Sequence, residues 1–338
     1  MINQIARKSV VVASAISMLA GCGKSGGSYS TLADADSYKQ EAAYVPKKID
    51  ILWIIDNSGS MQSSQKNLAD NFKSFIQRFQ SNNNDFRMAV GTTDAYKSST
   101  LARLRNNAGY YVMDKNTPNL ETVFVNTIKQ GINGSGDERA FQSMKDVLAL
   151  PANSTFRRPD AFLAVIIVSD EEDFSHSGSI STINESYTNP NLYTVQSFID
   201  WMDAYTGGIA SGRNYSISNI AIQDETCRKS LGSDKFPKRY HEITQKTAGI
   251  NGDLCADFGQ TLEIISDSIA QLSSSFKLTR EPIPESIVVT VNGSIVARDS
   301  VNGWTYDATT MTITFHGSAI PAASADVKIN FDPKSIKI

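Results

Sequence analysis

The chain has 338 residues and a nearly balanced charge, with 32 Lys and Arg against 35 Asp and Glu. A mildly acidic chain without a basic run is not typical of a nucleic-acid-binding protein, so nucleic acid is excluded as the expected ligand. The length is sufficient for one large hydrophobic core and a smaller second domain.

Residues 1–21 have the pattern of an export signal. Arg7 and Lys8 precede an apolar segment, residues 10–20, that is too short to span a bilayer. The segment ends in Leu-Ala-Gly before Cys22, and this resembles the lipobox of bacterial lipoproteins, in which the cysteine is acylated. The alternative is an ordinary secretory signal with an incidental cysteine.

The resemblance to a lipobox implies a lipid anchor at Cys22, in the cell envelope of a bacterium. Gly23 follows the cysteine instead of the Asp that often retains lipoproteins at the inner membrane, so the resemblance favours the outer membrane. Residues 22–47 are polar, rich in Gly and Ser, and lack an apolar period. They are predicted to form a flexible tether.

Hydrophobic runs alternate with helical patterns in residues 48–280. Residues 49–55 are apolar except for Asp50, as a buried parallel strand requires. Further strands are predicted at 86–93, 110–113, 161–168 and 217–222, and helices at 68–79, 122–128, 140–150, 193–205 and 258–272. This order predicts an α/β domain with a doubly wound, mostly parallel sheet, whose ligand site lies at the carboxyl ends of the strands.

Residues 281–338 are expected to form a small all-β sandwich-like module. Pro282 and Pro284 mark a linker, and Asn292-Gly293 between two alternating segments predicts a type I′ hairpin. Four or five short strands follow from the pattern.

Two cysteines, Cys227 and Cys255, remain besides Cys22. In an oxidising envelope compartment an even pair predicts a disulfide. Two free buried thiols are the alternative. Metal binding is disfavoured because no third or fourth soft ligand lies nearby in the sequence.

Three polar segments are expected to meet at one edge of the predicted sheet. Asp56, Ser58 and Ser60 follow the first strand, residues 131–138 precede a helix, and residues 169–173 follow the strand at 161–168. A carboxylate and two hydroxyls on a tight turn can hold a hard divalent cation and leave coordination positions open for an anionic ligand. The alternative is a helix N-cap that binds no metal.

Asp-x-Ser-x-Ser after a buried strand, with Asp170 after a later one, resembles the metal-ion-dependent adhesion site of von Willebrand factor type A (VWA) domains. Residues 49–61 and 168–174 carry this resemblance. The segments Thr92-Thr-Asp94, Arg239-Tyr-His-Glu-Ile and Asn251-Gly-Asp-Leu-Cys255, together with the β module, resemble a bacterial lipoprotein branch of that superfamily.

The resemblance implies a metal ligand set and a cofactor. Asp56, Ser58 and Ser60 match the first ligand loop, and Asp170 matches a distal aspartate that often reaches the metal through water. The threonine ligand of the family has no clean counterpart. Alignment on the following helix puts Ser135 in its place, with Gly136 or Asp137 as shifts of register. The implied cofactor is Mg²⁺ or Mn²⁺, since both accept this oxygen set.

The expected function is adhesion or scaffolding without catalysis, in which the metal accepts a carboxylate from a protein partner. One alternative is a metal-dependent hydrolase, and another is a structural envelope protein with a vestigial metal site. Hydrolysis is disfavoured because position 58 is Ser, not a second carboxylate, and because the three histidines, His176, His241 and His316, are scattered.

Several neighbours of the expected site receive simpler interpretations. The acidic run 171–173 is expected to be a solvated loop, with added acidity or a second cation as the alternative. His176 is expected to be an exposed loop histidine, with an approach to the site as the alternative. Asp94 is expected to be a turn residue, with a place at the rim of the site as the alternative. Residues 175–193 are either a specificity loop or a tolerated insertion.

Overall fold

The structure is a computed structural model that describes residues 38–43, 48–81, 85–208, 213–233, 235–321 and 325–334. The predicted export signal and Cys22 lie outside the described residues. Among the helices that are described, none is both long enough and apolar enough to cross a membrane.

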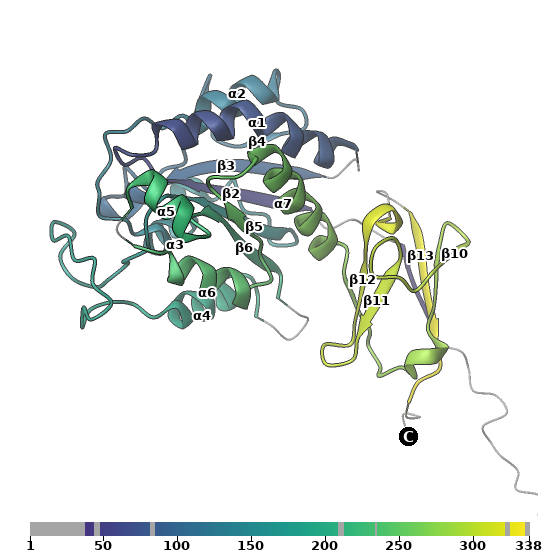
Figure 1. Ribbon diagram of the computed structural model, residues 1–338. Helices are drawn as coiled ribbons and strands as arrows, with labels where there is room; N and C mark the ends of the chain where they lie inside the picture. The colour runs from purple at the N-terminus through teal and green to yellow at the C-terminus, as the bar shows by residue number, and fades with distance from the viewer. Residues whose placement is uncertain are drawn as a thin grey trace, which may run out of the picture. The chain divides into compact units, whose positions relative to one another are not determined.

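A six-stranded sheet forms the centre of the larger domain (Figure 1), in the order β4-β3-β2-β5-β6-β7. Its strands are β2 (Ile49–Ile55), β3 (Phe86–Thr92), β4 (Met113–Asp114), β5 (Phe162–Val168), β6 (Tyr215–Ala221) and β7 (Asn251–Asp253). Only β4 is antiparallel to its neighbour. The predicted doubly wound, mostly parallel α/β fold is therefore confirmed. From β2 the chain first adds strands on one side, β3 and β4, and then on the other, β5, β6 and β7. This reversal point of the sheet, between β2 and β5, is where such folds bind ligands.

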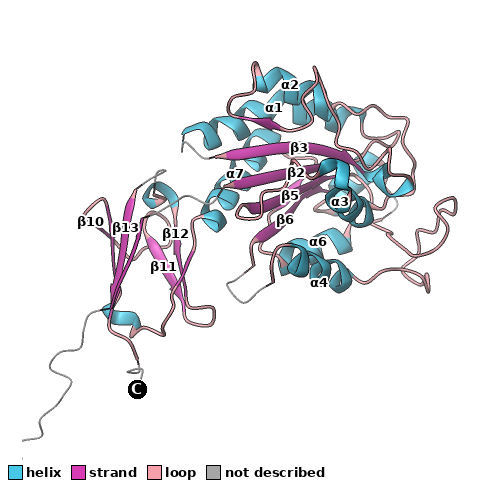
Figure 2. Cartoon of the chain, turned by 180° about the vertical axis from the view of Figure 1, so that it is seen from behind, coloured by secondary structure: helices cyan, strands magenta, loops and turns pink. Residues whose placement is uncertain are grey.

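Helices cover both faces of the sheet (Figure 2). One face packs against α1 (Gln62–Ser81), α2 (Leu120–Ile128) and α7 (Phe258–Ser273), and the other against α3 (Ala140–Ala149), α4 (Val195–Tyr205) and α6 (Lys238–Lys246). Within β2, Trp53 belongs to the first core and Leu52 to the second. All seven residues of β2 are buried, as a central strand with helices on both sides requires.

The short helices are α5 (Glu225–Leu231) and the 3₁₀ turns η1 (Thr93–Lys97), η2 (Pro151–Asn153), η3 (Pro284–Ser286) and η4 (Gly317–Ala319).

Asp50 interrupts the apolar run of β2 near its amino end. Its buried carboxylate accepts hydrogen bonds from Arg158 Nε at 2.8 Å and from Arg157 Nη1 at 3.2 Å. A buried charge is tolerated when it is paired in this way. The pair lies at the opposite end of the strand from Asp56, so it supports the fold and not the candidate site.

The remaining strands form two small antiparallel sheets. One has the order β1 (Tyr38–Ala43), β13 (Asp326–Phe331), β9 (Val288–Val291), β10 (Ser294–Val296), and the other β11 (Trp304–Asp307), β12 (Thr312–Phe315), β8 (Phe276–Lys277). Both contribute to one core, for example through Val289 and Phe315. Asn292 and Gly293 have φ values of 51° and 80°, as a type I′ turn requires. The module is a small β-sandwich.

The structure corrects the expected tether at residues 38–43. These residues form β1, which pairs along its whole length with β13 near the other end of the chain. β8 likewise precedes residue 281, where the module was expected to begin. The third predicted strand, 110–113, is also shifted: Tyr110 pairs with Asn107 in an isolated bridge, and the chain reaches β3 only at Met113.

Candidate metal centre

Asp56 lies directly after β2, beside the end of β5. Its backbone N–H donates to Val168 O at 3.0 Å. The carboxylate is fully buried and accepts hydrogen bonds from Ser58 N at 2.8 Å and from Ser169 Oγ at 2.7 Å. Burial raises the pKa of Asp56 to about 6, although both hydrogen bonds act to lower it. The parallel pairing of β2 with β5 thus holds a carboxylate at the reversal point of the sheet.

Hydroxyl groups connect the first loop to the loop after β5. Ser58 Oγ and Ser60 Oγ share a hydrogen bond at 3.3 Å, and Ser60 Oγ donates to Asp170 Oδ1 at 3.1 Å. Burial raises the pKa of Asp170, and the bond from Ser60 opposes the rise. The structure therefore brings together four of the five predicted ligands: Asp56, Ser58, Ser60 and Asp170.

The loop 131–138 packs closely on the first loop. Gly134 N donates to Asn57 O at 2.7 Å, and a Cβ at Gly134 would lie 2.5 Å from Asn57 Nδ2. Gln65 fixes the start of the loop, because its Nε2 donates both to Asp56 O at 2.8 Å and to Gly131 O at 2.9 Å. A glycine is required at 134 for this approach, and Gln65 is a contributor that the sequence pattern did not reveal.

Asp94 lies at the rim of this assembly. Its carboxylate accepts from Asn57 Nδ2 at 3.3 Å and from Ser135 N at 3.3 Å, and it pairs with Lys97 at 2.6 Å. The rim position, left as an alternative by the sequence, describes Asp94 better than that of a simple turn residue. Asp94 thereby joins the first loop, residues 56–60, to the loop 131–138.

Ser135, the fifth predicted ligand, has its hydroxyl in a local turn. Ser135 Oγ accepts a hydrogen bond from Asp137 N at 3.1 Å. Asp137 in turn is buried and pairs with Arg139 Nη2 at 2.7 Å and with Tyr96 OH at 3.0 Å. Asp137 is thus engaged in an internal ion pair.

Glu138 is the residue of this loop that sequence reasoning missed. Only 1% of it is exposed, and its backbone O accepts from Phe174 N at 2.8 Å. Neither carboxylate oxygen has a hydrogen-bond partner among the described residues. Thr93 lies near enough to lower the pKa of Glu138, but the bond that its hydroxyl forms, at 3.4 Å, is to Asn57. Burial and the negative charges of Asp56 and Glu171 nevertheless hold this pKa well above its usual value.

The acidic run after β5 is not the solvated loop that was expected. Glu172 and Asp173 are buried. Glu172 accepts from Arg239 N at 3.0 Å and Tyr187 OH at 2.7 Å, while Asp173 accepts from Phe141 N at 3.0 Å and pairs with Arg239 at 3.1 Å. Both are held in the fold by backbone and side-chain donors. Glu171 is more accessible, and burial together with the charges of Asp56 and Asp170 raises its pKa to about 7.

His176 is buried, so the expectation of an exposed loop histidine was wrong. Its Nδ1 accepts from Gly178 N at 3.0 Å. The fully buried Arg139 donates to the carbonyls of His176, Ser179 and Thr182 at 3.4, 3.1 and 3.1 Å. The base of the segment 175–193 is therefore anchored to the candidate site through Arg139, while Ile180 and Ile183 farther along it are exposed.

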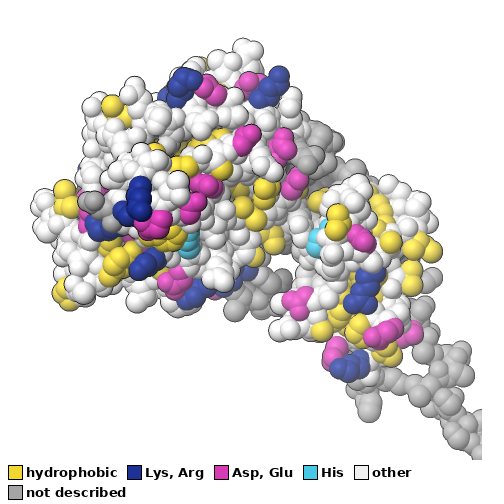
Figure 3. All heavy atoms as spheres, in the orientation of Figure 1, with side chains coloured by type: hydrophobic (Ala, Val, Ile, Leu, Met, Phe, Trp, Pro, Cys, Tyr) yellow, Lys and Arg dark blue, Asp and Glu magenta, His cyan; other side chains and the backbone are white. Residues whose placement is uncertain are grey.

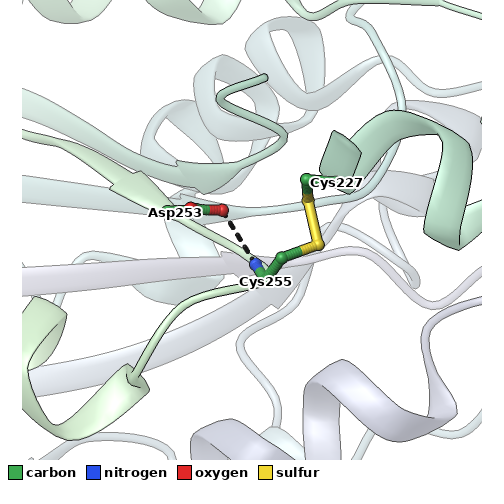
Figure 4. Close-up of side chains that lie close together, drawn as sticks. All are labelled: Cys227, Asp253 and Cys255. Carbon is green, nitrogen blue, oxygen red and sulfur yellow. Dashed lines mark hydrogen bonds between the residues drawn. A yellow bond between two sulfur atoms is a disulfide. The ribbon is translucent and has the colours of Figure 1, made fainter. Parts of the chain in front are cut away.

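Cys227 and Cys255 form a disulfide with a Cα–Cα distance of 5.6 Å (Figure 4). Asp253 accepts a hydrogen bond from Cys255 N at 2.9 Å. Among the described residues, these three form the one set of His, Cys, Asp or Glu side chains whose donor atoms all lie within 4.8 Å of one another. A disulfide offers no thiolate to a metal, so this cluster is structural.

The centre around Asp56 fits a hard divalent cation by the chemistry of its donors, which are carboxylate and hydroxyl oxygens. The carboxylates in the described residues do not converge as a tight set of three. Serine hydroxyls and water would therefore complete the coordination, as they do where a cation keeps open positions.

The face drawn in Figure 3 has Lys and Arg side chains scattered among Asp and Glu side chains. Over the described part of that face they form no continuous basic surface.

No family model matches the chain, and no curated protein matches it. Solved structures that match include proximal thread matrix protein 1 from the mussel byssus, at 14% identity and a TM-score of 0.40, over 71% of this chain and 52% of that one. The same protein with a zinc-occupied MIDAS motif matches at 13% identity and a TM-score of 0.38, over 72% and 51%. The pilus adhesin SpaC from Lactobacillus rhamnosus GG, in its open conformation, matches at 10% identity and a TM-score of 0.40, over 86% and 39%.

This chain thus spans about half of the mussel protein and less than half of the adhesin.

Proposed function

We propose that this chain is a VWA-type binding module that uses a divalent cation, Mg²⁺ or Mn²⁺, to hold an acidic side chain of a protein partner. Asp56, Ser58 and Ser60 would hold the cation directly, and Asp170 would act through water. The observation that carries the proposal is the hydrogen-bonded series Ser58–Ser60–Asp170 beside the buried carboxylate of Asp56, at the reversal point of the sheet.

Partner binding through one metal–carboxylate bond requires exclusion of water, because exposed ion pairs contribute little. Apolar side chains beside the cation would supply this exclusion. Ile132 is exposed on the loop that Gln65 ties to Asp56, and Ile180 and Ile183 are exposed on the segment that Arg139 anchors. These three side chains are the contacts that we assign to the partner.

The proposal includes no catalysis. A metal-dependent hydrolase usually has a general base near the metal, or a second carboxylate ligand two residues after the first. Position 58, two residues after Asp56, carries a hydroxyl instead of a carboxylate. His176 is buried, with Nδ1 engaged by Gly178 N, so it is poorly placed to exchange protons with a substrate. Binding is the function that this chemistry favours.

We place the module in the bacterial cell envelope, anchored by lipid at Cys22 and facing partners from the outer membrane. This part of the proposal rests on residues 1–22 of the sequence alone. Metabolic labelling with a palmitate analogue tests it, since Cys22→Ser should abolish the label and Cys227→Ser should not.

Isothermal titration of Mg²⁺ and Mn²⁺ into the full chain tests the cation site. We expect saturable binding that is lost in Asp56→Ala. Asp70→Ala is the matched control, because Asp70 is an exposed carboxylate on α1 that pairs with Lys66 in an i,i+4 pair. Binding that survives in Asp56→Ala, or equal loss in both variants, would refute the assignment of the site.

The partner's chemistry is tested with envelope proteins captured on the immobilised chain. Capture should require Mg²⁺, disappear with EDTA, and fail after the acidic side chains of the captured proteins are amidated. Capture that is insensitive to EDTA would refute a metal–carboxylate bond while leaving the cation site intact.

A further inference from the structure

Glu138 is a buried carboxylate that lies near the hydroxyl of Thr93. Only 1% of the residue is exposed, and both carboxylate oxygens lack a hydrogen bond among the described residues. Its neighbours in sequence are occupied elsewhere, since Asp137 and Arg139 pair with each other at 2.7 Å. The bond from Phe174 N to the backbone O of Glu138 joins the loop 131–138 to the end of the loop that follows β5, so the position of Glu138 is fixed between these two loops.

The surroundings of Glu138 are negative. The charges that act on it most strongly belong to Asp56 and Glu171, in the loops after β2 and β5, and to Asp94 at the rim of the candidate centre. An unpaired buried charge is strongly unfavourable, and like charges nearby increase the penalty. A cation shared by Glu138 and Asp56, with hydroxyl and water oxygens as its other ligands, would remove the penalty and satisfy the oxygens of Glu138 at once.

The hydroxyl of Ser135 is a weaker candidate for the same role. Ser135 Oγ already accepts from Asp137 N at 3.1 Å, and Ser135 N donates to Asp94. We infer that Glu138, not Ser135, is the ligand that the loop 131–138 supplies to the cation. This inference rests on the proposed cation site but not on the proposed partner.

A second carboxylate changes what the centre can do. Two carboxylate ligands, Asp56 and Glu138, together balance the charge of a divalent cation. If the hydroxyl of Ser135 were the ligand from the loop 131–138, Asp56 alone would leave the cation a net positive charge. Oxygen sites bind hard cations more tightly as the number of charged ligands rises. With Asp170 also beside the cation, the centre then offers a partner's carboxylate no excess positive charge, so the partner's affinity depends on the surrounding contacts more than on charge.

Titration of MnCl₂ into the full chain separates the two candidate ligands. Glu138→Gln has nearly the same volume and should weaken Mn²⁺ binding by at least about tenfold, since it removes a charged ligand. Ser135→Ala is the matched control and should change the affinity by less than about twofold. In EDTA, Glu138→Gln should unfold at the same temperature as the wild type or higher, because an amide of nearly the same volume replaces a buried carboxyl group that lacks a hydrogen bond among the described residues.

The outcomes are distinct. Mn²⁺ affinity unchanged in Glu138→Gln but reduced in Ser135→Ala overturns the inference and leaves the cation site standing. No saturable binding in the wild type overturns both. A lower unfolding temperature in EDTA with unchanged affinity assigns Glu138 a structural role only. If the Gln variant does not fold, Glu138→Asp retains the charge on a shorter arm, and wild-type affinity in that variant counts against direct ligation.

Discussion

Ser60 Oγ donates a 3.1 Å hydrogen bond to Asp170 Oδ1 and so joins two loops that are 110 residues apart in the chain. The contact exists because β2 and β5 are neighbours, with Ile55 opposite Val168. Each strand ends at the same edge, and each is followed at once by a polar residue. The centre is therefore a product of sheet topology as much as of its local motif.

Replacement of Ser60 by Ala should weaken Mg²⁺ binding by about ten- to a hundredfold, the range seen when a metal site loses a supporting oxygen. The loss has two causes, because Ser60 contacts both Ser58 and Asp170. Titration calorimetry measures it. Ser63→Ala replaces an exposed serine in the first turn of α1; it is the control and should bind like the wild type. Equal affinity in the two variants would remove Ser60 from the site.

The stabilisation by metal should depend on pH. The pKa of Asp56 is about 6 and that of Glu171 about 7, both above their usual values, so the metal-free folded state binds protons more tightly than the unfolded state. The contribution of these groups to stability is full below their unfolded pKa values and is lost as pH rises through 6 and 7. A cation needs the deprotonated carboxylates and acts in the opposite direction.

We therefore expect metal-free protein to lose stability between about pH 4 and about pH 7, and Mg²⁺ affinity to fall about tenfold per pH unit below 6 for each proton displaced. Thermal unfolding with EDTA or with saturating Mg²⁺ checks both. The rise in unfolding temperature that Mg²⁺ causes should be larger above the pKa of Asp56, which is about 6, than below it. An equal rise above and below this pKa would contradict the assignment of Asp56 as a ligand.

Arg139→Met should destabilise the fold by about 3–5 kcal/mol, because it leaves the buried carboxylate of Asp137 without its cation. It also removes the three bonds to the carbonyls of residues 176–182, so amide exchange there should quicken. Urea unfolding gives the free energy. The double variant Arg139→Met/Asp137→Asn should recover part of the loss, and failure to recover any of it would mean that the ion pair is not the cause.

Removal of the disulfide should lower the free energy of unfolding by about 3–4 kcal/mol, as the loop-entropy relation gives for a separation of 28 residues. Cys227→Ala/Cys255→Ala tests this by urea unfolding. A reductant should reproduce the loss in the wild type and have no effect on the double variant. A reductant-insensitive wild type would show that the bond is not formed in solution.

The elements that could be predicted are those whose signal is local. β2 and β5 are continuous apolar runs, and α1 repeats large apolar residues at helical spacing, so each had one reading. α6 was missed because its buried apolar residues are only Tyr240 and Ile243, too few to form a recognisable stripe. β1 was missed because its partner β13 lies at the far end of the chain, and nothing in its polar sequence indicates pairing.

The candidate site shows the same division. Asp56, Ser58 and Ser60 could be identified because their spacing and their place after a strand are local features. The burial of Glu138 and His176 could not, since it results from packing between loops that are distant in sequence. The sequence shows two adjacent carboxylates, Asp137 and Glu138, but only the fold reveals that Asp137 is the one that pairs with Arg139.

The pairing of β1 with β13 determines how the protein bears mechanical load. The six residues of β1 lie between the N-terminal segment and the whole α/β domain, and each pairs with a residue of β13. A pull along the chain from the N-terminal side loads this ladder in shear, so several hydrogen bonds must fail together before β1 leaves the sandwich. Such a pull is opposed by the β module as well as by the α/β domain, since β1 belongs to a sheet of the first and is followed in sequence by β2 of the second.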